Sequence, residues 1–432
     1  MKKKAIVLAT CGVLVSGMVG AQFYADHRLK AYYSMQEINK DKRIQKQAMN
    51  IDMGMWSGHA NWSYKILIDP CQPNKFVVIK GVDKIQRSWN GFNIHSDINL
   101  ELQGESAKQY QELLKGKALF TTDSKLNWLG NLNVKLTSPS LEYRDSDSHV
   151  VWSGMDGTLA FKQDQGEFDL TQMNVNMPGL TGSSGGNYLS LQSMVLKGKG
   201  GLLGQTLRSG DNEFTMNKML IVSQKSKQPM NIELQKLKFS SDVDVDSKET
   251  SLKNTWSIEQ VKSNNQQFKN IKINFNIAGL DSNALQQFIR ISNKGVSECS
   301  AEAQTAQQQQ LNQQLVNLMA HGLSFESKDN QIEVGTSKLS ATATGKVPAH
   351  AYTNIQDISR QIGKLVEINA NAEMDKSFIR EVMKASGQAS MNMSEQDYEM
   401  MLQQMVKNAH AQLQDNKVKF AMSYKNGNVS YP

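Results

Sequence analysis

The chain has 432 residues, of which 39% are hydrophobic and 21% are charged. This length predicts two or three domains, or one large β-rich domain, and the hydrophobic fraction is sufficient for a core, which argues against general disorder. The formal net charge is +7, but residues 1–47 hold nine Lys and Arg against three Asp and Glu. Residues 48–432 are nearly neutral, with 39 basic and 38 acidic side chains, so no nucleic-acid partner is expected.

Residues 1–25 have the pattern of a signal anchor or transmembrane helix. Lys2–Lys4 precede an uncharged run over Ala5–Ala25, which is long enough to cross about 30 Å of hydrocarbon. Because such lysines stay in the cytoplasm, the pattern predicts a single-pass protein with its body on the far side of the membrane. Cleavage near Val19–Ala21 is an alternative, and lipid attachment at Cys11 is a weaker one.

Residues 26–50 are expected to continue as a juxtamembrane helix. Tyr32 and Tyr33 suit a membrane interface, and basic residues such as Arg43 and Lys46 could contact anionic headgroups. A packed helical stalk with a solvated basic face is an equally compatible interpretation.

Residues 51–280 alternate between apolar and polar side chains with period two, as Phe92, Ile94 and Ile98 illustrate. Such alternation indicates strands with one buried and one wet face. It favours antiparallel pairing, because parallel strands read as continuously apolar. One helix is expected within this region, at 105–115. We therefore predict an α+β, β-rich fold with one large, curved antiparallel sheet.

Residues 281–432 are predicted to be a mixed region of helices and strands that packs on the sheet. The periodicity becomes helical over 281–322, and the Gln-rich stretch 301–322 could mediate self-association or lie solvated on the body. The oligomeric state stays open. Beyond this point the pattern predicts strands at 323–342, 365–372, 417–424 and 427–431, and helices at 375–387 and 394–414. Helices are thus expected mainly in the C-terminal third.

The cysteines allow one disulfide in the body. Cys71 and Cys299 could pair across a very long loop if the body lies in an oxidising compartment. Two separate buried thiols are the alternative. No Cys-x-x-Cys pair, Cys/His cluster or His-Glu-x-x-His motif occurs in the sequence, so no metal site is expected.

The run Gly182-Ser183-Ser184-Gly185-Gly186 matches the Gly-x-Ser-x-Gly pattern of a nucleophile elbow. An elbow needs a buried strand before the serine and a helix after it. Here a turn containing Pro178 precedes the motif and a strand near Tyr188 follows it, which favours a flexible turn. No catalytic residue and no cofactor are therefore expected, and the chain is predicted not to be an enzyme.

Several short segments follow the N-terminal anchor in a recognisable order. They are Ser140-Leu141-Glu142-Tyr143, Val150-Val151-Trp152-Ser153-Gly154, Phe214-Thr215-Met216-Asn217-Lys218-Met219, Ile271-Lys272-Ile273-Asn274-Phe275 and Ala278-Gly279-Leu280-Asp281-Ser282-Asn283-Ala284. Together they resemble the bacterial YdgA family over nearly the whole chain, as far as the turn at 426–427. The resemblance implies an inner-membrane protein with a largely periplasmic body and an uncharacterised function. It supplies no catalytic residues and adds no support for the disulfide.

Three functional hypotheses follow. The first is a non-enzymatic envelope protein with a structural or partner-binding role, in which the helices of 281–414 cover the apolar face of the sheet. The second is a lipid-binding or lipid-bridging module, in which part of that face stays open as a groove. The third is a hydrolase that uses Ser184. The discriminating question is whether four aromatic residues line an open surface or a filled one: Trp62, Phe92, Trp128 and Trp256.

Overall fold

The computed structural model describes residues 44–431, except 55, 70, 103–104, 128, 165–166, 202–205, 225–228, 265, 295–298 and 386–393. The anchor predicted over 1–25 therefore lies outside the described residues, as does most of the predicted juxtamembrane helix. Among the described residues, no helix is long and apolar enough to cross a membrane.

Strands dominate the described part of the chain. They are β1 (Ile44–Met53), β2 (Ser57–Leu67), β3 (Phe76–Ser88), β4 (Gly91–Glu101), β5 (Phe120–Asn127), β6 (Asn131–Ser138), β7 (Leu141–Arg144), β8 (Ser148–Trp152), β9 (Met155–Asp164), β10 (Glu167–Ser184), β11 (Asn187–Gly201), β12 (Arg208–Ser223), β13 (Met230–Val245), β14 (Glu249–Ser263), β15 (Gln266–Asp281), β16 (Leu323–Val334), β17 (Ser337–Val347), β18 (Glu367–Asp375), β19 (Gln412–Gln414), β20 (Lys417–Lys425) and β21 (Asn428–Ser430). The prediction of a β-rich fold is confirmed.

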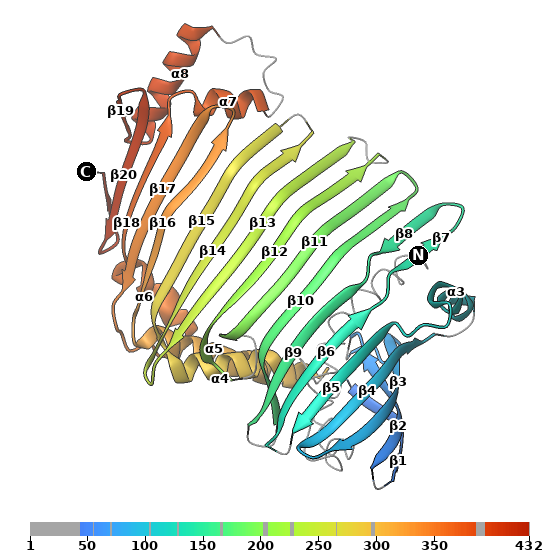
Figure 1. Ribbon diagram of the computed structural model, residues 1–432. Coiled ribbons are helices and arrows are strands. Elements are labelled where there is room, and N and C mark those ends of the chain that lie inside the picture. Colours follow the sequence, from blue (N-terminus) through green and yellow to red (C-terminus); the bar gives the residue numbers. More distant parts are fainter. Residues whose placement is uncertain are drawn as a thin grey trace.

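These strands form one antiparallel sheet (Figure 1). Its pairings run from β1 through β6 to β9 and then strand by strand from β10 to β18. β20 follows β18, and its other edge pairs with β19 and β21. The β7–β8 hairpin joins the second half of β10. The strands after residue 281 thus extend the sheet, while the helices of that region pack against it.

Six helices are described: α3 (Glu105–Leu114), α4 (Ser282–Lys294), α5 (Ala301–Ala320), α6 (Ile355–Leu365), α7 (Phe378–Ala385) and α8 (Glu395–Asn408). α6 was not predicted from the sequence, although Asn354 caps it by accepting a hydrogen bond from the backbone N of Asp357 at 2.9 Å. α8 ends before the predicted residue 414, because His410 adopts a positive φ of 51° and the chain then forms β19.

Residues 44–50 correct the prediction of a helix over 26–50. They belong to β1, where Ile44 is buried and pairs with Ile66 of β2. Gln, Lys, Ala and Met in this segment are good helix formers, so local preference favours a helix. Pairing with β2, which has a buried face, overrides that preference, because tertiary contacts contribute more to stability than helix propensity does.

The N-terminal strands and the central strands are packed differently. Strands β1–β6 bend away from the plane of the later strands (Figure 1). Their apolar side chains join those of β9 and β10 in one large buried cluster, which includes Ile85, Leu132 and Val175. Two smaller clusters lie where helices meet the later strands, and a third joins α5 to α6. The molecule therefore has a filled N-terminal end and a sheet whose later part is covered locally by helices.

A row of unusual backbone conformations crosses the central strands. The φ values of Ser193 in β11, Lys236 in β13 and Asn270 in β15 are 52°, 51° and 50°. The strand registers place these three residues in one line across the sheet, perpendicular to the strands. Along these strands the spacing of apolar residues is two on either side of the row and three across it. The change of spacing indicates that the apolar side chains stay on one face of the sheet across the row.

Candidate functional site

The central strands present a broad apolar band on one face, which a row containing Asn212, Ser241 and Asn254 separates from the end near α4 and α5. Directly paired residues of antiparallel strands share a face of the sheet. Two adjacent rows cross β11 to β15 in this way, and every member is apolar: Leu196, Phe214, Phe239, Trp256 and Ile273 in one row, and Met194, Met216, Leu237, Ile258 and Ile271 in the other. The rings of Phe239 and Trp256 pack with their centroids 4.5 Å apart.

The same face continues through the later strands. Ile277 of β15 pairs with Phe325 of β16, which lies across the ladder from Gly345 of β17. The rings of Phe275 and Phe325 are 6.5 Å apart. Three further cross-strand rows reach β20: Leu339, Met374 and Val418; Ala341, Ala372 and Phe420; and Ala343, Ala370 and Met422. From β10 to β20 the face spans on the order of 45 Å, given about 4.8 Å between neighbouring strands.

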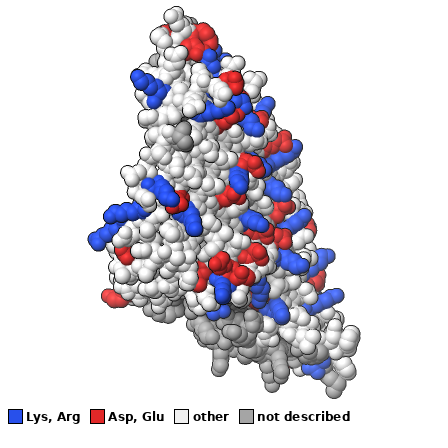
Figure 2. Space-filling model, turned by 90° about the vertical axis from the view of Figure 1, so that its left-hand side faces the viewer, with Lys and Arg blue, Asp and Glu red and all other residues white. Residues whose placement is uncertain are grey.

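The opposite face of these strands is polar and charged. Lys238 Nζ lies 2.6 Å from Glu213 Oε2, and Lys425 Nζ lies 2.8 Å from Glu367 Oε1. Lys417 pairs with Glu373 in the same way. In Figure 2, positive and negative side chains alternate along one margin of the molecule, whereas few charges interrupt the broad surface beside it. The sheet is therefore amphipathic, with one face suited to water and the other to apolar groups.

Helices cover this apolar face at its two ends. At one end α4 and α5 pack on Val243, Leu252 and Ile277, which form a cross-strand row of that face. At the other end the cluster of α7 and α8 includes Met374 and Val418. Figure 1 shows these helix pairs at opposite ends of the strands.

The middle of the face is open. Trp256, Ile273 and Phe275 keep 49%, 50% and 39% of their surface exposed. They are neighbours, because Trp256 pairs with Ile273 and Phe275 lies two residues further along β15. Three large apolar side chains thus meet water side by side, between the two helix-covered ends. Because adjacent exposed large apolar side chains are uncommon on a folded protein, this patch is the candidate site.

The four aromatic residues selected from the sequence do not lie together. Trp62 and Phe92 are buried in the N-terminal cluster, so they contribute to a filled core. Trp256 lies on the open face, and Trp128 lies outside the described residues. The residues that sequence reasoning did not select for this surface are Phe239, Ile273, Phe275 and their row neighbours. The signal for them was present as matching alternation in consecutive strands, but the pairing that aligns the rows is not local.

Trp62 is held by a buried carboxyl group. Its Nε1 donates to Asp83 Oδ1 at 3.0 Å and lies 3.1 Å from Oδ2, and Asp83 is fully buried. Burial raises the pKa of Asp83 to about 8. The indole ring also covers Gly81, its cross-strand partner, where a Cβ atom would lie 2.0 Å from Trp62. This arrangement serves packing of the N-terminal end.

The Gly-x-Ser-x-Gly segment forms a hairpin. Ser184 ends β10, Gly185 and Gly186 turn with positive φ, and Asn187 begins β11 opposite Ser184. Ser148 Oγ donates a hydrogen bond to Ser184 Oγ at 3.0 Å. The strand–turn–helix geometry that a nucleophile elbow requires is therefore replaced by strand–turn–strand. In the described part of the chain, no group of three or more His, Cys, Asp or Glu residues could hold a metal ion.

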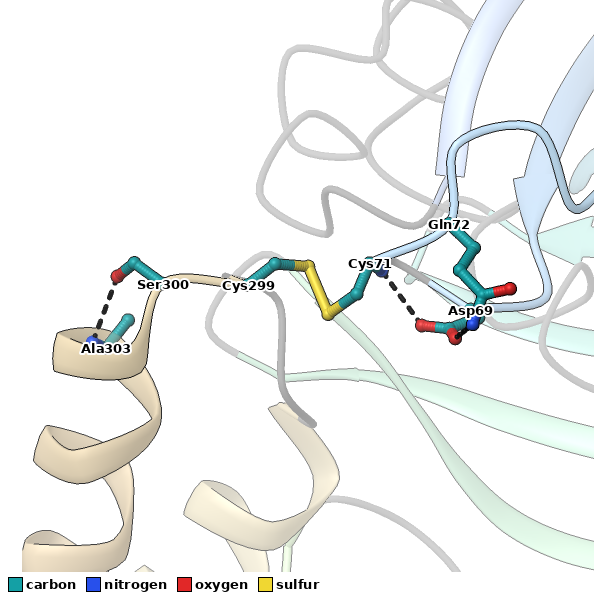
Figure 3. Close-up of a disulfide and its surroundings, with 6 residues drawn as sticks. All are labelled: Asp69, Cys71, Gln72, Cys299, Ser300 and Ala303. Carbon is teal, nitrogen blue, oxygen red and sulfur yellow. Dashed lines mark hydrogen bonds between the residues drawn. A yellow bond between two sulfur atoms is a disulfide. The ribbon is translucent and has the colours of Figure 1, made fainter.

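A disulfide joins Cys71 and Cys299, whose Cα atoms are 5.2 Å apart (Figure 3). Cys71 lies in the connection between β2 and β3, where Asp69 Oδ1 accepts from its backbone N at 2.9 Å. Cys299 directly precedes α5, whose N-cap Ser300 accepts from the backbone N of Ala303 at 3.1 Å. The bond ties the N-terminal end of the sheet to the helices that cover one end of the apolar face.

Comparison with known proteins identifies the family. The sequence model of a protein family, described as bacterial protein of unknown function (DUF945), matches residues 78–431. Protein YdgA of Escherichia coli (strain K12) is 21% identical over 355 residues, which cover 76% of this chain and 70% of that protein. No solved structure shows a significant match. Since the family model spans most of the sequence, the chain belongs to the DUF945 family of bacterial proteins, to which the YdgA-like resemblance pointed.

Proposed function

We propose that this chain is a non-enzymatic lipid-binding protein of the bacterial envelope, and that the open middle of the apolar face holds phospholipid acyl chains. One observation carries the proposal: Trp256, Ile273 and Phe275 are exposed side by side on a face whose two ends are covered. An acyl chain that covers these side chains removes their apolar surface from water, which stabilises the complex by about 25 cal/mol per Å² of apolar area buried.

The composition of the face favours an acyl chain over a polar ligand. Both central rows are apolar in every member, and the neighbouring rows on β17, β18 and β20 consist of Ala, Leu, Met, Val and Phe. A polar ligand would need donors and acceptors at matching positions among these groups. A flexible hydrocarbon chain needs only apolar area and adapts to an irregular surface of methionine and aromatic side chains.

The proposed location follows from the sequence. We place the chain at the bacterial inner membrane through the segment 1–25, with the body in the periplasm. The disulfide supports this placement, because such bonds persist in oxidising compartments. A membrane-anchored periplasmic body has phospholipid within reach as its ligand.

The test is photo-cross-linking at two adjacent positions of the full chain in bacterial membranes. A photoreactive amino acid replaces Trp256 on the apolar face or Ser257 on the polar face, where Ser257 lies between Lys238 and Lys272. We expect a phospholipid adduct by mass spectrometry at position 256 and none at 257. A protein adduct at 256, or equal lipid labelling at both positions, would contradict the proposal and favour a partner-binding role.

A further inference from the structure

Three neighbouring turns at one end of the N-terminal strands expose large apolar side chains. Trp56 lies in the β1–β2 turn, Trp89 in the β3–β4 turn and Leu129 in the β5–β6 turn. Their exposed fractions are 70%, 92% and 85%. These values exceed those of the open apolar face, and the three residues belong to neither that face nor the buried cluster.

The three turns lie next to one another. Strands β1 to β6 pair in chain order and antiparallel, so their odd-to-even turns fall at the same end of the sheet. The backbone N of Arg87 donates to the carbonyl O of Trp56 at 2.8 Å, which places the first turn beside β3. Gly91, directly after the second turn, pairs with Asn127, which begins the third. We call Trp56, Trp89 and Leu129 the turn cluster.

Hydrogen bonds order the second and third of these turns. Asn127 Oδ1 accepts from the backbone N atoms of Leu129 at 3.0 Å and Asn131 at 2.8 Å. In the second turn, Ser88 Oγ donates to Asn90 Oδ1 at 3.0 Å. The exposure is therefore a property of defined hairpins and their turn chemistry.

We propose that the turn cluster docks on the surface of an anionic phospholipid bilayer. Tryptophan is enriched at membrane–water interfaces, where its ring is apolar and its N–H remains near water. Arg87 and Lys125 are exposed beside the turns and complement anionic headgroups, each contributing about 1 kcal/mol near such a surface.

The form of the turn cluster favours a bilayer over a protein partner. Its members project from narrow hairpin turns, and projecting side chains can enter a fluid interface without a matching pocket. A stable protein interface requires about 1,000 Å² or more of complementary surface, which three turn residues do not supply. This proposal is independent of whether the apolar face holds lipid, because it rests on different strands.

The test is a fluorescence measurement on the full chain, in which an environment-sensitive fluorescent amino acid replaces Trp89. The matched control carries the probe at Tyr188, an exposed aromatic residue next to the β10–β11 turn at the opposite end of the sheet. With phosphatidylethanolamine–phosphatidylglycerol vesicles, we expect a blue-shifted emission and a several-fold loss of quenching by aqueous iodide at 89, with no change at 188. Equal iodide quenching at position 89 with and without vesicles would overturn the proposal.

A second variant tests whether the three residues of the turn cluster dock together. With the probe at 89, Trp56→Ser combined with Leu129→Ser should remove most of the protection, and the exposure of both side chains leaves the fold intact. Unchanged protection in this variant would contradict a shared docking surface. Vesicles of phosphatidylcholine should protect less, and equal protection would refute the role given to Arg87 and Lys125. A separate sample, with the photoreactive amino acid at position 256 and the same vesicles, distinguishes this result from lipid binding on the apolar face.

Discussion

At the residue scale, the Trp62–Asp83 pair shows how a polar group is accommodated in the filled end of the sheet. The carboxyl group is fully buried, and its pKa of about 8 means that it holds a proton over most of the neutral range. The indole N–H donates to it, and Gly81 leaves room for the indole ring. Trp62, which the sequence suggested for a ligand surface, is thus part of the core.

This burial predicts a pH-dependent stability. Between about pH 4 and pH 8 the folded chain retains a proton on Asp83 that the unfolded chain releases, so this carboxyl lowers stability as pH rises, by up to about 1.4 kcal/mol per pH unit. Asp83→Asn accepts the Trp62 hydrogen bond and cannot ionise. We expect it to flatten the pH dependence of the free energy of unfolding, measured with urea at pH 5, 6.5 and 8. Exposed Asp211→Asn serves as the control, and an Asp83→Asn variant with the wild-type slope would contradict the assignment.

At the element scale, the helices decide where the amphipathic sheet is closed. α4 and α5 cover one end of the apolar face and α7 and α8 the other. The Cys71–Cys299 bond links the helix pair at the first end to the β2–β3 connection. The position of α5 is therefore set by apolar packing, by its N-cap and by a covalent bond to a distant strand pair.

Removal of this disulfide should weaken the joint between the helices and the N-terminal strands. We expect Cys71→Ser with Cys299→Ser to lower the free energy of unfolding by about 2–4 kcal/mol, because the unfolded chain loses a cross-link that closes a long loop. Hydrogen exchange should rise first in α4 and α5. Reductant should have the same effect on the wild type and none on the variant. If the variant unfolded at the wild-type urea midpoint, the bond would not stabilise this joint.

At the scale of the whole molecule, the central and later strands separate two environments. Ion pairs line one face, and apolar rows line the other from β11 to β20. The N-terminal strands bury their apolar side chains in a cluster, while β14 and β15 leave Trp256, Ile273 and Phe275 exposed. A continuous sheet thus provides both a stable core and an open apolar surface.

A ligand for that surface should stabilise the whole fold. Anything that binds the folded chain alone adds RT ln(1 + [L]/Kd), or about 2.7 kcal/mol at a hundredfold excess over Kd. Soluble short-chain phosphatidylglycerol should therefore raise Tm by a few degrees. We expect Phe239→Glu with Trp256→Glu to abolish the rise, and Ser257→Glu on the polar face to retain it. An equal rise in all three proteins would indicate binding elsewhere.

Much of the fold could be predicted from local patterns. Alternation with period two identified the strand-rich region, and the helices at 105–114 and 301–320 matched their predicted positions closely. α6 was missed although its apolar residues recur at helical spacing and Asn354 is a good N-cap, so the local signal was present and was not used. Residues 44–50 were read as helix, because the strand there depends on a partner rather than on its own residues.

By itself, the sequence determined the class of the protein: a β-rich, nearly neutral body whose strands have one apolar and one polar face. It could do so because side-chain alternation is a property of each strand alone. Only the tertiary structure decided that Trp62 is core and Trp256 is exposed, since both lie in strands with similar alternation. Whether an apolar face is filled or open depends on the bend of the sheet and on which helices pack across it, and these arise from contacts between residues far apart in the chain.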